Sequence, residues 1–235
     1  MLLKKTVFPI ALWCMALMAG AQTTQNWGLQ INPNFSSRRL VVFESLSQAE
    51  IDAIDSIETY KPSWSAGLFV QWRGEKVGFQ MGLNFMDTGY RTIKTQVLPD
   101  DPDAANASQR RITYQNYFLE APIDLYFYQA LDDNNEFIFT FGTGGGYNLR
   151  NFQKRQFYQG DSKGDSSRET DPDNDNFRKV AMEIRFGMGW ETQLSERLSF
   201  ALLPNFQFWT KGLYQDASIN RHLYAIGVQG MLRFR

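Results

Sequence analysis

The amino-acid sequence predicts an all-β protein, an eight-stranded antiparallel up-and-down transmembrane β-barrel with long extracellular loops and short periplasmic turns. Two features of the pattern favour this fold: apolar residues recur at every second position in eight segments, and long and short connections alternate between the segments. The 235-residue chain also has a mean hydropathy of −0.40 and, after its first segment, no apolar run near the roughly 18 residues of a membrane helix.

The first 21 residues are predicted to be a cleaved signal peptide. Lys4 and Lys5 form its charged start, Val7–Met18 its apolar stretch, and Ala19-Gly20-Ala21 a small-residue cleavage site. A buried first helix is the alternative, but the composition changes sharply after Gln22. We therefore expect a signal peptide at 1–21 and one barrel domain at 22–235.

The single cysteine of the chain, Cys14, lies inside this predicted signal. A lipid-modified cysteine would need small residues before it, whereas Trp13 precedes Cys14. The rest of the chain has no cysteine, which suits a protein exported to an oxidising compartment.

The clearest signal of the fold is the segment Asn116–Tyr128. One row of alternate residues is apolar from Tyr117 to Phe127, whereas the other row holds Glu120 and Asp124 among aromatic rings. Successive side chains of a strand point to opposite faces, so this segment is predicted to be a strand with one apolar and one mixed polar face. Such a strand fits a barrel whose outside meets lipid and whose inside is polar.

The same alternation defines all eight predicted strands: Asn26–Ser36, Trp64–Arg73, Val77–Phe85, Asn116–Tyr128, Phe137–Arg150, Val180–Glu191, Leu198–Phe208 and Tyr224–Phe234. Two long polar stretches, Thr92–Arg111 and Phe152–Phe177, are predicted to be external loops.

A short amphipathic helix is predicted in the first long connection, at about Gln48–Ile57. Ser47 and Glu50 have the spacing of a capping box, and Leu46 can pack on Ile51. The helix either folds a long loop onto the barrel rim or forms a partner site.

Charged residues on the predicted inward rows form the main candidate site. Buried charges need partners, so four acids and four bases predict an interior polar network. Glycines at 142, 144, 146, 187 and 189 would leave room for these longer side chains. The network is either a structural plug or a path for protons or ions, with a catalytic acid pair as a further alternative. Its predicted members are Glu120, Asp124, Glu183, Arg185, Glu191, Arg73, Arg150 and Arg233.

Aromatic residues near the strand ends are expected to form the girdles that flank the hydrocarbon layer. The candidates are Trp64, Trp72, Tyr117 and Trp190.

Two weaker patterns suggest chemistry. Ser218 and His222, the only histidine, lie four residues apart near the last strand, as a membrane-facing catalytic pair would require. Asp171, Asp173 and Asp175 have the spacing of a calcium loop, but Asn176 stands where such a loop needs glycine. We therefore predict no catalytic residue, no metal ion and no cofactor.

Several short motifs resemble one family. Tyr117-Phe118-Leu119-Glu120-Ala121-Pro122, the Gly-rich segment Phe141–Tyr147, Phe186-Gly187-Met188-Gly189-Trp190 and the near-terminal Phe234 are similar to the PorT-family outer-membrane β-barrels of Bacteroidota. The resemblance covers essentially the whole chain after the predicted signal. One departure is Arg235, since many barrels end on the aromatic ring itself. The resemblance implies an outer-membrane barrel, and its founding branch is tied to protein secretion.

We accordingly predict a small non-enzymatic barrel of the cell outer membrane, a structural or interaction module of the envelope that is accessory to secretion or assembly. The alternatives are a membrane-embedded lipid-modifying enzyme and a soluble lipocalin-like barrel that binds a ligand. The expected partners are outer-membrane lipid and other envelope proteins reached through the external loops, around a monomeric barrel. A formal net charge of −1 gives no electrostatic reason to expect nucleic acid.

Overall fold

The computed structural model of the protein describes residues 23–43, 47–99 and 107–235. The predicted signal peptide at 1–21 lies outside these residues, and so does Leu46, the predicted packing partner of Ile51.

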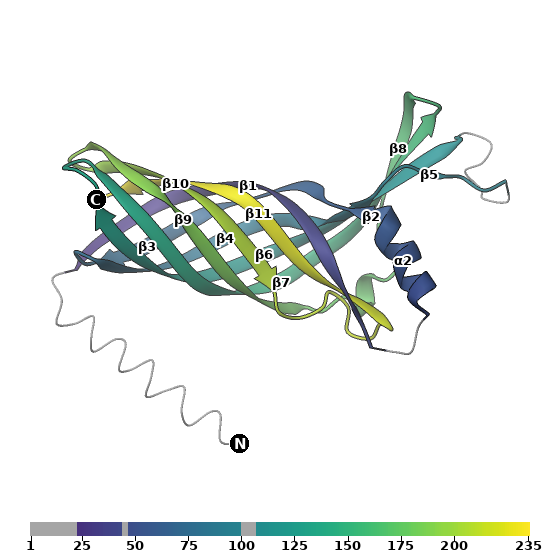
Figure 1. Ribbon diagram of the computed structural model, residues 1–235, viewed down its shortest axis with the longest axis horizontal. Helices are drawn as coiled ribbons and strands as arrows, with labels where there is room; N and C mark the ends of the chain where they lie inside the picture. Colours follow the sequence, from purple (N-terminus) through teal and green to yellow (C-terminus); the bar gives the residue numbers. More distant parts are fainter. Residues whose placement is uncertain (1–22, 44–46, 100–106) are drawn as a thin grey trace, which may run out of the picture.

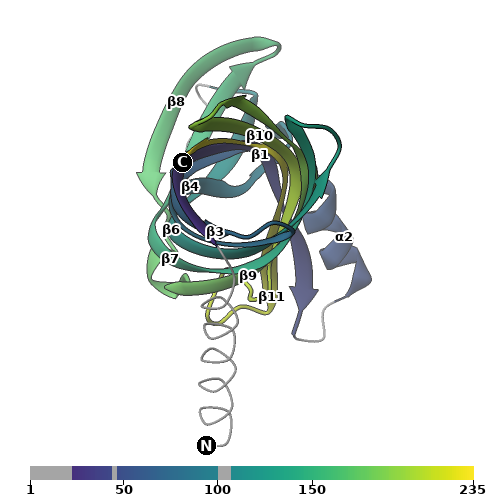
Figure 2. The same cartoon turned by 90° about the vertical axis from the view of Figure 1, so that its left-hand side faces the viewer.

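Eight long antiparallel strands close into a ring, which confirms the predicted barrel (Figures 1 and 2). Each strand pairs with the next along the chain, and pairing of the first with the last, from Trp27↔Phe234 to Val42↔Ile219, closes the ring. The ring consists of β1 (Thr24–Val42), β3 (Lys61–Arg73), β4 (Val77–Thr92), β6 (Gln109–Ala130), β7 (Asn135–Gln159), β9 (Val180–Ser195), β10 (Leu198–Trp209) and β11 (Ile219–Phe234).

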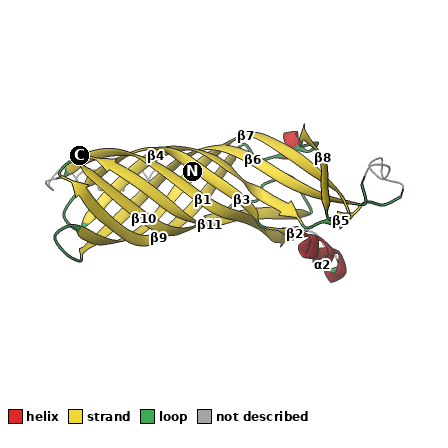
Figure 3. Cartoon of the chain, turned by 90° about the horizontal axis from the view of Figure 1, so that it is seen from above, coloured by secondary structure: helices red, strands yellow, loops and turns green. Residues whose placement is uncertain are grey.

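The helix α2 (Gln48–Ile57) has the predicted bounds and the predicted capping box. Ser47 Oγ accepts a hydrogen bond from Glu50 N at 3.3 Å, and Glu50 Oε2 accepts one from Ser47 N at 2.9 Å. Figure 3 shows α2 beside one end of the barrel. Among the described residues, no helix is long and apolar enough to span a membrane.

Four further elements are short or peripheral, and all belong to the long connections. They are β2 (Glu58–Thr59), β5 (Thr95–Gln96), β8 (Ser162–Thr170) and the 3₁₀ turn η1 (Asn174–Asn176).

The two faces of the wall have opposite polarity. Outward side chains are apolar and exposed, as in Leu83 (54%) and Val180 (59%), whereas the inward Gln71 and Gln80 are completely buried. A soluble ligand-binding barrel needs the reverse arrangement, so these faces argue against the lipocalin-like alternative.

The interior is layered, as the inward row of β6 shows. Glu120 and Asp124 lie between Phe118 on one side and Tyr126 and Tyr128 on the other. Phe118 belongs to an apolar cluster near the end with long connections, and the two tyrosines belong to a second cluster near the short turns. A polar layer therefore lies between two aromatic layers.

One predicted loop is wrong. The stretch Phe152–Phe177 was expected to be irregular, but β7 continues to Gln159 and β8 pairs back onto it. With β5 and the first part of β6, these strands form a sheet that projects beyond the ring, which we call the overhanging sheet (Figure 1). Almost every β8 side chain is exposed, so neither of its faces required an apolar row.

Candidate functional site

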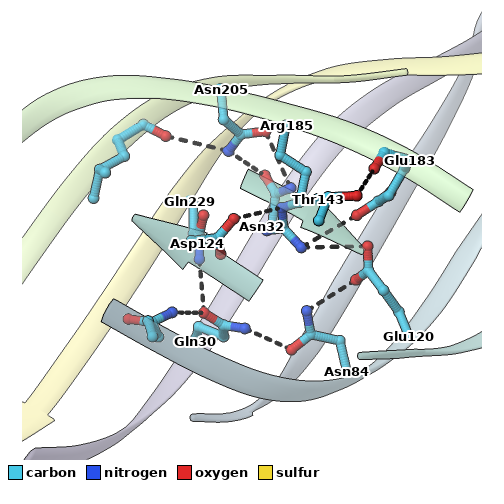
Figure 4. Close-up of polar contacts among 12 residues, drawn as sticks. Gln30, Asn32, Asn84, Glu120, Asp124, Thr143, Glu183, Arg185, Asn205 and Gln229 are labelled. Atoms are coloured by element: carbon cyan, nitrogen blue, oxygen red, sulfur yellow. Dashed lines mark hydrogen bonds and ion pairs between the residues drawn. The ribbon is translucent and has the colours of Figure 1, made fainter. Parts of the chain in front are cut away.

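Arg185 is the centre of the polar layer inside the barrel (Figure 4). Its Nη1 lies 3.3 Å from Glu120 Oε1 and 3.4 Å from Glu183 Oε1, and its Nε lies 3.6 Å from Asp124 Oδ1. β6 supplies Glu120 and Asp124, and β9 supplies Glu183 and Arg185. The structure thus brings four predicted residues into one cluster, in which three carboxylates surround one guanidinium.

A chain of amides extends this cluster around the lumen. Asn84 Nδ2 donates to Glu120 Oε2 at 2.9 Å, and Gln30 Nε2 donates to Asn84 Oδ1 at 2.6 Å. Gln229 and Gln80 then donate to Gln30 Oε1 at 2.7 and 3.3 Å. The sequence patterns did not single out these amides, although their alternation with apolar residues is the signal that could have found them.

A second cluster lies nearer the short turns and contains three more predicted residues. Glu191 accepts hydrogen bonds from Arg233, from Ser199 and, at 3.2 Å, from Arg73. Arg73 also pairs with Glu136, and its guanidinium lies 4.0 Å from the centre of the Tyr128 ring. The buried charges of this cluster thus compensate one another.

Arg150 does not belong to the interior, so this part of the prediction is wrong. It is exposed, and its guanidinium lies 5.3 Å from the centre of the Phe152 ring. Tyr117 pairs with Arg150 but Phe118 pairs with Asn148, a β-bulge that inserts one residue. The bulge reverses the alternation beyond it, so Arg150 points outward and Asn151 is buried.

Charged residues that the sequence patterns missed fill the end with long connections. Arg38 donates to Glu58 Oε2 at 2.6 Å, and Arg221 donates to Glu58 Oε1 at 2.6 Å. Lys61 Nζ lies 2.6 Å from Asp87 Oδ1. Four of these residues fall beyond the predicted limits of β1, β3, β4 and β11, which are longer than predicted, and Glu58 lies in β2, a strand that was not predicted.

The inward glycines lie against neighbouring strands and not against distant side chains. A Cβ at Gly142 would lie 2.0 Å from Asp124 Oδ1, and one at Gly144 would lie 2.8 Å from Glu183 Oε1. These two glycines leave the space that the carboxylates of the polar layer occupy.

The predicted girdle residues lie near both ends of the outer wall. Trp64 and Tyr117 belong to a row of rings, Trp64–Phe85–Tyr117–Phe152, with ring centres 5.4–5.8 Å apart, which we call the ring belt. Trp72 packs with Phe79 near the short turns, and Trp190 is exposed near the end of β9.

The geometry does not assemble a Ser–His pair. The ring of His222 stacks on Phe208, and its Nδ1 lies 3.2 Å from the carbonyl oxygen of Trp209. Ser218 precedes β11, where its carbonyl accepts a hydrogen bond from Phe43 N.

The acidic loop at 171–175 is held by a hydrogen bond to its own backbone. Asp171 is buried, its Oδ1 accepts a hydrogen bond from Asp173 N at 3.0 Å, and burial raises the pKa of its carboxyl group. In the part of the chain that the structure describes, no group of three or more His, Cys, Asp or Glu side chains is arranged to hold a metal ion.

A groove of about 980 Å³ lies outside the barrel between α2 and the wall. Ile51 and Asp55 of α2 line one side, and Arg39, Phe206 and Tyr224 of the wall line the other. The ion pair between Asp55 and Arg38, at 2.7 Å, ties α2 to the barrel rim.

Comparison with known proteins assigns the fold to a family. A family model described as the outer membrane protein beta-barrel domain matches residues 20–209. The chain therefore belongs to this family of outer-membrane β-barrels, and its place is the outer membrane. The start of β1, the end of β11 and the short turns lie at one end of the ring, which is the periplasmic end in such barrels, so the overhanging sheet and α2 are extracellular (Figure 1).

Solved structures give only a distant likeness. Neisserial surface protein A is 8% identical with a TM-score of 0.39, over 88% of this chain and 96% of that one. The attachment invasion locus protein Ail of Yersinia pestis is 10% identical with a TM-score of 0.31, over 88% and 97%. The outer membrane protease OmpT of Escherichia coli is 7% identical with a TM-score of 0.40, over 92% and 97%.

These low scores carry no argument about function. The search of curated proteins found no match.

Proposed function

We propose that this protein is a small non-enzymatic barrel that acts as a structural or interaction module of the envelope, accessory to secretion or assembly. The observation that carries the proposal is the division between a filled interior and an exposed overhanging sheet. The ion-paired layer lies between aromatic layers, whereas the side chains of β8 are almost all exposed. Contacts with other molecules are therefore made from outside the ring.

The filled interior argues against a conducting path. Glu120, Asp124 and Glu183 each lie within ion-pair distance of Arg185, and Glu191 pairs with two arginines. A group that moved through this layer would have to separate buried ion pairs, at a cost of several kcal/mol for each ion. The network serves as a structural plug.

The alternative function, a membrane-embedded lipid-modifying enzyme, has no support comparable to that for an interaction module. His222 directs Nδ1 at a backbone carbonyl, and the hydrogen bonds of the described residues do not join it to Ser218.

The motifs Tyr117–Pro122 and Phe141–Tyr147 support a place in the PorT-like branch of Bacteroidota barrels, which is part of the proposal. The barrel acts as a monomer, with lipid around its wall and envelope proteins at its extracellular elements.

Photo-crosslinking in the native envelope tests the proposal. A probe amino acid is placed at Ser166 in β8 and, as the matched control, at Leu83 on the outward wall; both side chains are exposed. We expect discrete protein adducts from position 166 and none from position 83. The proposal fails if position 166 gives no adduct while the purified barrel shows steady single-channel conductance.

A further inference from the structure

The overhanging sheet has one strongly basic face. Cross-strand pairing places Lys154 beside Thr113 and Arg168, and Arg150 beside Tyr117. Gln156 and Tyr158 belong to the same alternate row of β7 as Lys154. Gln156 pairs with Arg111 and Tyr158 pairs with Lys163, so these two basic residues lie on the same face. We call these five basic residues the cationic face. It continues the outward face of the barrel wall, because Tyr117 belongs to the outward row of β6.

Three basic side chains of this face have no carboxylate partner in the part of the chain that the structure describes. Among the described residues, no carboxylate forms an ion pair with Arg150, Lys154 or Arg168. The carboxylate nearest in register, Glu169, pairs with Gln153, whose row faces the other way. The face therefore concentrates positive charge in a chain whose formal net charge is −1.

Aromatic rings hold two of the guanidinium groups in place. Arg168 lies 4.1 Å from the centre of the Phe152 ring, and its Nη2 donates to Tyr117 Oη at 2.8 Å. Arg150 lies 5.3 Å from the centre of the same Phe152 ring. Two like charges thus converge on one ring, an arrangement that an anion between or above them would stabilise.

The position of this face indicates which anion it meets. Tyr117 and Phe152 end the ring belt that begins at Trp64, and such belts lie at the boundary between hydrocarbon and headgroups. Lys154 and the β8 strand follow Phe152 toward the extracellular side. The cationic face therefore lies at the depth of the lipid headgroups in the outer leaflet.

We propose that the cationic face binds the phosphate groups of a phosphorylated glycolipid in the outer leaflet of the outer membrane. Arg150 and Arg168 contact the phosphate in the planar, paired manner of guanidinium groups, and Lys154 adds a point charge. The ring belt packs against the sugar and the start of the acyl chains. This inference deepens the proposed function, on which it rests, by naming the chemistry of one partner.

Native mass spectrometry of the full chain in zwitterionic phosphatidylcholine nanodiscs tests the inference. The probes are bisphosphorylated lipid A, dephosphorylated lipid A, and a soluble sulfated polysaccharide. The test variant carries Arg150→Gln, Lys154→Gln and Arg168→Gln. The control variant carries Lys76→Gln, Arg155→Gln and Arg197→Gln, which remove the same charge from the short-turn end and from the other face of the sheet.

We expect bisphosphorylated lipid A to bind the unaltered chain and the control variant alike. A basic residue beside an anionic headgroup strengthens binding about fivefold, so the test variant should bind about 100-fold more weakly. Dephosphorylated lipid A should bind no better to the unaltered chain than to the test variant.

Three results would each overturn the inference: equal affinity for both forms of lipid A, equal losses in the two variants, or binding of the sulfated polysaccharide without binding of lipid A. Retained heat-modifiable gel migration shows that the test variant is folded. If protein adducts at Ser166 persist while lipid A fails to bind, the interaction role stands and only this partner is wrong.

Discussion

Arg185 and Arg150 show that the contribution of an arginine to the free energy of unfolding depends on its position. Arg185 is buried among three carboxylates, whereas Arg150 is exposed beside one aromatic ring. Removing the cation from a buried cluster leaves uncompensated charge, so Arg185→Ala should destabilise the barrel by about 3–5 kcal/mol. Urea unfolding in lipid vesicles measures this loss.

The matched control is Arg150→Ala, which should change the free energy of unfolding by no more than about 0.5 kcal/mol. Equal effects of the two substitutions would mean that Arg185 is not the cation that holds the polar layer.

Close packing between strands gives a second prediction at single residues. A Cβ at Gly189 would lie 2.0 Å from the carbonyl oxygen of Leu202, whereas one at Gly145 would meet nothing within 4 Å. Gly189→Ala should therefore cost at least the roughly 1–3 kcal/mol of an overpacked site, and Gly145→Ala should be close to neutral. The same unfolding assay checks both variants, and a neutral Gly189→Ala would contradict the close approach.

Residues inside the regular alternation could be predicted, and residues at its limits could not. Glu120, Asp124, Glu183 and Arg185 were predicted together because period two holds without interruption around them. Arg150 was assigned to the wrong face because a bulge leaves no mark in the pattern of apolar residues. Arg38 was missed because the charged ends of long strands resemble loops in sequence.

At the scale of elements, local hydrogen bonding made α2 predictable, and the absence of any buried face made β8 unpredictable. Ser47 and Glu50 define the start of α2 within four residues of sequence. The β8 strand pairs with β7 alone among the described strands, and all but one of its residues are exposed. Pattern analysis finds strands through their apolar rows, so a strand without such a row goes undetected.

The turn between β6 and β7 gives a prediction about pH. Asp132 accepts hydrogen bonds from the Asn135 side chain at 2.9 Å and from the backbone N atoms of Asn134 and Asn135, and these bonds hold its pKa below the ordinary value of 3.8. The stability that this carboxylate contributes is therefore present above that ordinary value and is lost as the pH falls through the lowered one.

Asp132→Ala should accordingly speed unfolding at neutral pH and have a smaller effect at about pH 2, because the fraction of ionised carboxylate falls with the pH. Asp133→Ala, at the adjacent exposed position, is the matched control and should have little effect at either pH. Unfolding rates by tryptophan fluorescence measure both variants. An effect of Asp132→Ala that is the same at both pH values would show that these hydrogen bonds do not stabilise the turn.

At the scale of the whole molecule, the opposite polarity of the outward and inward faces supports the assignment as an outer-membrane barrel. The outward wall is apolar and belongs in lipid, and the interior is filled by buried amides, ion pairs and rings. The overhanging sheet, α2 and the cationic face then form the extracellular surface through which the protein meets its surroundings.

Spin labelling along β4 tests this arrangement most directly, since the chain from Gln22 onward has no cysteine and each label can be placed singly. Met81 and Leu83 are outward and 44% and 54% exposed, whereas Gln80 and Asn84 are inward and buried. In lipid vesicles, labels at 81 and 83 should be accessible to oxygen but not to a water-soluble nickel complex, and labels at 80 and 84 to neither. Access of the nickel complex to 80 and 84 would reveal a water-filled pore, and access to 81 and 83 a wall outside the membrane; either result would contradict the account.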